Sequence, residues 1–325
     1  MKSFEYAAPR SLKEAVALLS DTWGRTEVLA GGTDLVTSLK QRITQPNRVV
    51  SLRNLRELKG IRPKRGGISI GATTTLADFV SDGEIKKSFP SLLTAAQDIG
   101  SPQILHTGTV GGDLCQRPRC WYFRNGYGLL GREGDTSLVR EGDNRYHAIF
   151  GNEGPALFVN PSSLAPALIA LGAEFTLTGP GGKTRTLPAG EFFRTPKSET
   201  ERETALKPNE ILTEIFLPNK GLKNATYEVR HRHGLDWPYV SASVAFTMKA
   251  GTVSDARVVL GHVAPVPWAA ARAGDALNNA ALNDTLAAKC GDAAAEGARP
   301  LSGNAYKVQM VKVAVKRAVL AAAAA

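Results

Sequence analysis

Two short glycine turns constrain this chain more than any other feature of its sequence. They lie in Leu29–Leu35 (LAGGTDL) and Thr107–Leu114 (TGTVGGDL). Each places two adjacent glycines beside a small polar residue and just before an apolar one. Because glycine has no Cβ, such turns can adopt positive φ angles and can present backbone N–H groups to an anion. Two interpretations stay open: plain strand-to-helix turns, or a ligand with two phosphates held from both sides.

Neither turn matches the best-known phosphate-binding motifs. No Gly-Lys-Ser/Thr follows either glycine pair, which excludes a Walker loop. Neither turn spells GxGxxG, so a Rossmann dinucleotide site is not supported. Thr33 and Thr109 can add hydroxyl donors. Two similar turns in one region therefore favour a cofactor, but the spacing alone does not name it.

The composition favours an ordinary globular protein of two or three domains. The chain has 325 residues, of which 43% are hydrophobic and 22% charged. Three cysteines are too few for a disulfide framework, and no apolar signal or membrane-spanning run is visible, so we expect a cytoplasmic location without membrane insertion. The net charge of +10 is scattered, without a basic tail or an aromatic-and-basic stripe. We therefore expect no nucleic-acid partner.

Up to residue 219 the sequence alternates between strand-like and helix-like patterns. Ser11–Glu14 predicts a capping box that starts a helix. Strands are expected at Thr26–Ala30, Arg48–Leu52, Gly67–Gly71 and Glu210–Leu217, with a hairpin across Ala173–Leu187. Further helices are expected at Leu35–Lys40, Leu76–Val80 and Ser91–Ile99, and from Ser162 onward. Residues 115–155 lack periodicity and predict a long irregular insertion.

The remainder of the chain predicts a second, smaller α+β domain. Asn219–Asn224 has the composition of a linker, which divides the chain into residues 1–219 and 223–325. Strands are expected at Tyr227–His233, Ser241–Ala250 and Ala256–Ala264, followed by two helices near Ala269–Asn279 and Lys307–Ala321. In the last helix the valines predict a buried face, and the lysines Lys307, Lys312 and Lys316 are expected outside.

Residues that bind metals or act as nucleophiles are sparse. Cys115 and Cys120 are close in sequence but Cys290 is remote, whereas zinc and iron–sulfur sites need three or four ligands. His231 and His233 share one face of an expected strand, which is typical of a structural pair. We predict no catalytic side chain and no metal site.

The run Arg117–Arg124 (RPRCWYFR) combines arginines with aromatic residues. Such a segment can cover a planar ring system or dock a protein partner. A loop held only by aromatic packing is the alternative, and the sequence leaves both open.

These motifs together resemble the FAD-binding medium subunit of molybdenum hydroxylases. That family includes the flavin subunits of xanthine dehydrogenases, carbon monoxide dehydrogenases and bacterial aldehyde oxidoreductases. The resemblance covers nearly the whole chain and rests mainly on AGGTDL at 30–35 and TVGGDL at 109–114. Supporting segments are Phe4–Tyr6, NPSSLAPAL at 160–168, Asn209–Leu212 and Asp236–Ser241.

The resemblance implies an α+β fold and a set of cofactor-binding residues. The FAD-binding domain would have two α+β subdomains, as in vanillyl-alcohol oxidase, followed by the C-terminal α+β domain. The first loop would wrap the FAD pyrophosphate, the second would close on it from the other side, and Leu212 would lie near the flavin ring. The implied site residues are Val28, Leu29, Ala30, Gly31, Gly32, Thr33, Asp34, Leu35, Thr109, Gly111, Gly112, Asp113, Leu114, Ser163 and Leu212.

Two positions of the site depart from the family pattern. Asp113 stands where an asparagine is usual, and its carboxylate would repel a diphosphate unless it points at a hydroxyl. Ser163 stands where an aspartate is usual, which removes a carboxylate expected near the cofactor.

The insertion departs from the family as well. Aldehyde oxidoreductase relatives carry a 4Fe–4S cluster there, and Cys120 matches one of its ligands. The other ligand positions fall near Leu130, Ser137 and Ala156, which are poor iron ligands. We therefore predict an insertion without a cluster.

The resemblance further implies an oxidoreductase subunit of a heterotrimer. A molybdenum-cofactor large subunit would oxidise the substrate, and a 2Fe–2S small subunit would pass electrons through FAD to an external acceptor. Two alternatives stay open: a stand-alone flavin oxidoreductase and a flavin-free assembly subunit.

Overall fold

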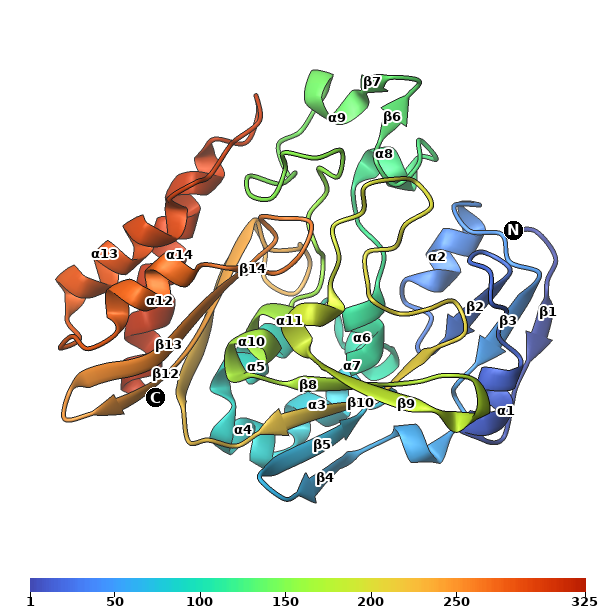
Figure 1. Ribbon diagram of the computed structural model, residues 1–325, viewed down its shortest axis with the longest axis horizontal. Coiled ribbons are helices and arrows are strands. Elements are labelled where there is room, and N and C mark those ends of the chain that lie inside the picture. Colours follow the sequence, from blue (N-terminus) through green and yellow to red (C-terminus); the bar gives the residue numbers. More distant parts are fainter.

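The computed structural model describes residues 1–325 and contains three main sheets that lie side by side (Figure 1). The first sheet is parallel and has the strand order β1-β3-β2. Its strands are β1 (Glu5–Ala7), β2 (Thr26–Leu29) and β3 (Arg48–Ser51), and its helices are α1 (Leu12–Ala17) and α2 (Leu35–Lys40). The Ser11 hydroxyl accepts a hydrogen bond from the Glu14 N–H and starts α1, as the capping pattern predicts.

The second sheet is antiparallel, with the order β4-β5-β10-β8-β9. Its strands are β4 (Ile61–Lys64), β5 (Gly67–Gly71), β8 (Glu174–Thr178), β9 (Thr184–Pro188) and β10 (Ile211–Pro218). The accompanying helices are α3 (Leu76–Ser81), α4 (Gly83–Ser88), α5 (Pro90–Gln97), α6 (Pro102–Thr107), α7 (Val110–Cys115), α10 (Leu164–Leu171) and α11 (Ala189–Phe192). The short 3-10 helices are η1 (Arg56–Leu58) and η2 (Pro180–Gly182). The apolar faces of these elements form the largest hydrophobic core, which reaches Ala245 and Val259 of the third sheet.

The third sheet is antiparallel and follows the strand order β11-β12-β13-β14. Its strands are β11 (Lys223–Val229), β12 (Val240–Lys249), β13 (Thr252–Gly261) and β14 (Trp268–Ala269). The helices α12 (Ala271–Leu277), α13 (Asp284–Ala295) and α14 (Tyr306–Ala324) cover it in orange to red in Figure 1. The α+β fold class is confirmed.

Three expectations for this region are wrong. The segment Asn219–Asn224 is not wholly a linker, because β11 begins at Lys223. A third helix, α13, stands between the two expected ones. Lys307 is buried, at 1% exposure, because its ammonium donates to the carbonyl oxygens of Tyr146, His147 and His262 at 2.9–3.2 Å.

The insertion at residues 115–155 projects at the top of the view in Figure 1 and carries only short elements. These are α8 (Trp121–Arg124), β6 (Arg132–Glu133), β7 (Thr136–Ser137) and α9 (Leu138–Glu141). Its end returns to the third sheet, where Ile149 and Phe150 donate from their backbones to Val263 and join the C-terminal core. The insertion therefore contacts both halves of the molecule.

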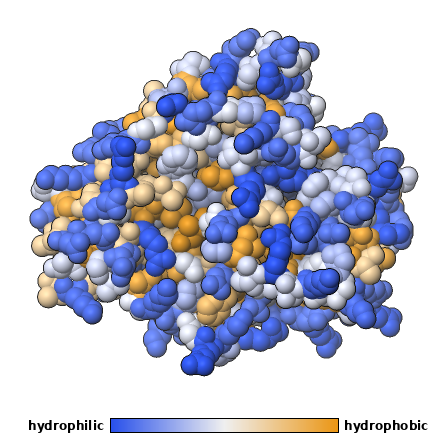
Figure 2. Space-filling model, viewed as in Figure 1, coloured by the Kyte–Doolittle hydropathy of each residue, from blue (hydrophilic) through white to orange (hydrophobic).

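Hydrophilic residues cover most of the face seen in Figure 2, and apolar residues show mainly in its middle. None of the helices combines the length and the apolar character that crossing a membrane would require.

Candidate functional site

The two glycine turns meet at the backbone. A Cβ built on Gly31 would lie 1.9 Å from the carbonyl oxygen of Thr107, so only glycine allows this contact. Gly111 is packed in the same way against Ala72, whose carbonyl oxygen would lie 2.8 Å from an added Cβ. Gly32 has φ +80°, a conformation that glycine adopts without strain. The glycines therefore bring the two turns together as well as freeing their surfaces.

The backbone amides of the two turns differ in their hydrogen bonding. In the first turn, none of the N–H groups of residues 31–35 donates a hydrogen bond within the chain. In the second turn the N–H groups of residues 110–113 are all engaged, with Thr74, Ala72 and Thr109 as acceptors. The expectation that both turns offer bare amides is thus wrong for the second. Only the first turn forms an open nest for an anion.

An open cleft with about 1360 Å³ of empty space lies over these turns. It is lined by most of the residues that the sequence proposed: Val28, Ala30, Gly31, Gly32, Thr33, Asp34, Leu35, Thr109, Gly111, Gly112 and Leu212. Four proposed residues fall outside its lining: Asp113 and Ser163 line a second pocket, and Leu29 and Leu114 line neither. Leu29 ends β2 and packs behind Gly32, and Leu114 is buried in the core.

A second pocket with about 980 Å³ of empty space lies on the other side of the turns. It is lined by Asp113 and Ser163. It is also lined by Ile99, Arg230 and Trp237, which the sequence did not propose as cofactor-binding residues. The two pockets share Thr33, Asp34, Thr109, Gly112 and Gln116. Together they form a two-lobed groove with the glycine turns at its junction.

Asp113 points away from the free amides. Its carboxylate accepts hydrogen bonds from the Ser162 hydroxyl, from the Leu164 N–H at 3.2 Å and from Gln116 Nε2 at 2.9 Å. Burial raises the pKa of Asp113 to about 6, and the bond from Ser162 opposes that rise. The carboxylate is therefore directed at a hydroxyl and at the start of α10. Its effect on a bound diphosphate stays a prediction.

Ser163 is buried directly before α10 and its side chain makes no capping bond. Asp113 supplies that cap from the neighbouring turn. The start of α10 is therefore capped by Asp113 and by the Ser162 hydroxyl, without a carboxylate at position 163.

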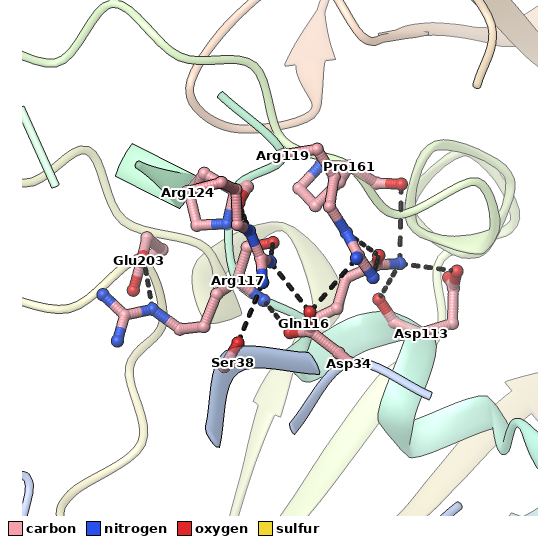
Figure 3. Close-up of polar contacts among 10 residues, drawn as sticks. Asp34, Ser38, Asp113, Gln116, Arg117, Arg119, Arg124, Pro161 and Glu203 are labelled. Atoms are coloured by element: carbon pink, nitrogen blue, oxygen red, sulfur yellow. Dashed lines mark hydrogen bonds and ion pairs between the residues drawn. The ribbon is translucent and has the colours of Figure 1, made fainter. Parts of the chain in front are cut away.

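Asp34 lies in the middle of this polar network, between Asp113 and the Arg117–Glu203 pair (Figure 3). It stands directly before α2 but makes no capping bond to that helix. Its carboxylate instead accepts from Arg124 Nη2 at 2.8 Å and the Arg117 N–H at 2.9 Å, and it pairs with Arg119 at 3.2 Å. The arginines of the insertion therefore reach the first glycine turn, which sequence spacing did not reveal.

The far wall of the cleft carries further charges that sequence reasoning missed. Arg117 pairs with Glu203 at 2.7 Å, and Arg202 lies 3.7 Å from Glu27. Burial raises the pKa of Glu27, and the charge of Arg117 opposes this. Cys115 also lines the cleft, and burial raises the pKa of its thiol to about 12. The Cys115 thiol is therefore not a nucleophile at neutral pH.

The histidines His231 and His233, and Cys120 of the insertion, do not gather into one metal site. His231 and His233 follow β11 in a turn instead of on a strand, and His233 pairs with Asp98 at 2.9 Å. Cys120 Sγ lies 3.1 Å from His147 Nε2, a pairing that the sequence did not suggest. No group of three or more His, Cys, Asp or Glu side chains gathers anywhere in residues 1–325.

Aromatic packing holds the segment Arg117–Arg124, as the second interpretation expected, and ion pairs hold it as well; its covering of a ring or docking of a partner stays a prediction. Its arginines are held by Asp34 and Glu203, and Trp121 packs edge-on against Tyr146 and His147.

A glycine turn with free amides at the centre of a two-lobed groove defines a protein that binds a long, phosphate-bearing cofactor. Comparisons identify which one. Residues 2–220 match the FAD binding domain in molybdopterin dehydrogenase, and residues 225–322 match the CO dehydrogenase flavoprotein C-terminal domain. The chain belongs to this family of oxidoreductase subunits, the FAD-binding medium subunits of molybdenum hydroxylases, and its cofactor is FAD.

Individual relatives agree over nearly the full length. The carbon monoxide dehydrogenase medium chain of Hydrogenophaga pseudoflava is 32% identical over 98% of this chain and 96% of its own. The aldehyde oxidoreductase FAD-binding subunit PaoB of Escherichia coli K12 is 30% identical over 96% of both. A solved structure of the H. pseudoflava carbon monoxide dehydrogenase superposes with a TM-score of 0.77 at 32% identity, covering 99% of this chain and 97% of that one.

Proposed function

We propose that the chain is the electron-transfer subunit of a heterotrimeric molybdenum hydroxylase. In this complex a molybdenum-cofactor large subunit passes electrons to a 2Fe–2S small subunit. The present chain receives them from the small subunit and passes them to an external acceptor. Bound FAD contributes the chemistry, because its ring system accepts electrons singly and releases them in pairs. The relatives named as medium chains or FAD-binding subunits support this assignment.

The observation that carries the proposal is the run of free amides at residues 31–35. These N–H groups would hold the FAD diphosphate, and the two pockets would take the two ends of the cofactor. Leu212 lines the first pocket together with Leu52 and Ile211, so this more apolar lobe suits the flavin ring. Arg230 and Trp237 line the second pocket, which suits the adenosine end.

The side chains around the first lobe suit a site that transfers only electrons. The nearby carboxylates of Glu203 and Glu27 face arginines, and the Cys115 thiol stays protonated. In this proposal the paired carboxylates help to orient the ring, and only electrons pass through the site.

The chain divides, in this proposal, into an FAD-binding domain at residues 1–219 and a C-terminal domain at 223–325. The cytoplasmic location stays a prediction. Limited proteolysis of the purified chain would test the division.

An anaerobic reduction experiment tests the electron-transfer role. The FAD-loaded chain is mixed with substrate and either both candidate partner subunits or the large subunit alone. We expect flavin absorbance near 450 nm to bleach only when the 2Fe–2S subunit is present. Bleaching by substrate with the isolated chain would instead support a stand-alone flavin oxidoreductase. Absence of bound flavin in the purified chain would support an assembly subunit.

A further inference from the structure

The side chain of Asp34 takes an unusual direction for its position. An aspartate directly before a helix ordinarily accepts hydrogen bonds from backbone N–H groups two or three residues farther on. Asp34 makes no such bond, and the Thr37 N–H three residues ahead has no acceptor in the chain. The carboxylate faces the insertion instead (Figure 3).

Arg124 is the main anchor of this arrangement. Its guanidinium donates to Asp34 and to the Ser38 hydroxyl, each at 2.8 Å, and also to the carbonyl oxygens of Arg117 and Pro118. Only 12% of its side chain is exposed, against 26% for Arg119. Charge-assisted bonds made in such a screened position are strong and directional. Arg124 therefore fixes where the charge of Asp34 lies.

We propose that the insertion positions Asp34, with Arg124 as the positioning residue, so that the free amides of the first glycine turn remain available to the FAD diphosphate. This inference rests on the proposed FAD site. Without Arg124, only the Arg117 N–H and Arg119 restrain the carboxylate, which can then turn toward the free N–H groups of Leu35 and Thr37 at the start of α2. Its negative charge would then lie on the side of the turn that the diphosphate occupies, and FAD would bind more weakly.

The charges around the turn are consistent with this role. Two guanidiniums, of Arg119 and Arg124, face the single carboxylate of Asp34. Of the other nearby acids, Asp113 is directed at Ser162 and the start of α10, and Glu203 and Glu27 face Arg117 and Arg202. Arg119 also lines the second pocket, where its guanidinium carbon Cζ lies 4.7 Å from the centre of the Trp237 ring. In this arrangement the Asp34 carboxylate lies against the two guanidiniums of the insertion instead of at the amides of the first turn.

A double-mutant cycle with FAD affinity as the readout tests the inference. The full chain is prepared as wild type, R124Q, D34A and R124Q/D34A, and FAD binding is titrated by flavin fluorescence. R124Q should weaken FAD binding about tenfold or more in the wild-type background, which corresponds to about 1.4 kcal/mol. In the D34A background the same substitution should change the affinity by less than about twofold. Once the Asp34 carboxylate is removed, FAD affinity should thus no longer depend on Arg124.

The controls separate positioning from folding. R132Q changes an exposed arginine of the same insertion that bonds only to the carbonyl oxygen of Asp135, and it should bind FAD like wild type. If R124Q does not fold, R119Q probes the same carboxylate from a more exposed position; because Arg119 also lines the second pocket, only the part of its loss that D34A cancels supports the inference, and no cancellation would overturn it.

Each outcome has one meaning. An equal loss from R124Q with and without Asp34 would overturn the inference, because it would mark a purely structural arginine. Wild-type affinity in R124Q would overturn it as well. Failure of the wild-type chain itself to bind FAD would overturn the proposed function instead.

Discussion

Gly31 offers the sharpest test of how the site is built, through the substitution Gly31→Ala. The added Cβ would lie 1.9 Å from the carbonyl oxygen of Thr107, whereas real Cβ atoms essentially never approach closer than 3.0 Å. The two turns must therefore separate by at least 1.1 Å, the difference between 3.0 and 1.9 Å. Both contact partners are backbone, so no flexible side chain can absorb the shift.

Two measurable losses follow from that separation. Overpacking of this kind lowers the free energy of unfolding by about 1–3 kcal/mol. A displaced turn also loses the alignment of its amides with the diphosphate. Since a hydrogen bond to a charged group contributes about 1.5–3 kcal/mol, losing one weakens FAD binding about ten- to a hundredfold.

The assay pairs denaturant unfolding with FAD titration. Gly154→Ala is the matched control, because no atom lies within 4 Å of an added Cβ there and its φ is not positive. The control should match wild type in both measurements. A Gly31→Ala chain with wild-type stability and wild-type FAD affinity would refute the claim that the turns are held together at this glycine.

The remaining predictions concern one buried lysine, one buried acid and the insertion. Burial lowers the pKa of Lys307 from 10.5 to about 7, so the unfolded chain binds more protons between these values, and the contribution of Lys307 to stability rises with pH. The difference in unfolding free energy between wild type and K307M should accordingly increase from pH 7 to 9 in denaturant titrations; a constant difference would contradict this. The raised pKa of Asp113, about 6 instead of 3.8, predicts that the stability of wild type relative to D113N falls as pH rises through this window. D113N should keep FAD affinity within about threefold of wild type, because that side chain caps α10; a larger loss would place the carboxylate on the cofactor. Iron and sulfide analysis of the purified chain should find no cluster beside Cys120, and about four irons per chain would refute this.

Elements whose determinants are local were predictable from the sequence. The helix Leu35–Lys40 and the strand Gly67–Gly71 occur at the predicted residues, since a turn before each and an apolar pattern within each determine them. The pairing of the two glycine turns around one cleft is also as the motifs indicated. Helix α13 was missed because its buried stripe consists of alanine, cysteine and glycine and contains no large apolar residue.

Features that depend on partners distant in sequence were not predictable. Lys307 belongs by spacing to a solvent face, yet it is buried because three carbonyl oxygens from Tyr146, His147 and His262 converge on it. The amides of the second turn looked free, yet Ala72 and Thr74 accept from them across a bridge that no local pattern encodes.

The insertion links these distant contacts into one arrangement. Near its start, Arg119 and Arg124 hold the acid of the first glycine turn. Near its end, the backbone carbonyl groups of residues 146–147 receive the Lys307 ammonium of α14. Ordering a loop of this length lowers the conformational entropy of the chain. The hydrogen bonds and ion pairs that the insertion makes with both halves of the molecule offset that loss. Deleting it would therefore remove two supports together, the tie to the C-terminal sheet and the restraint on Asp34. A shortened chain should lose stability and FAD affinity in parallel, whereas R124Q should lose mainly affinity.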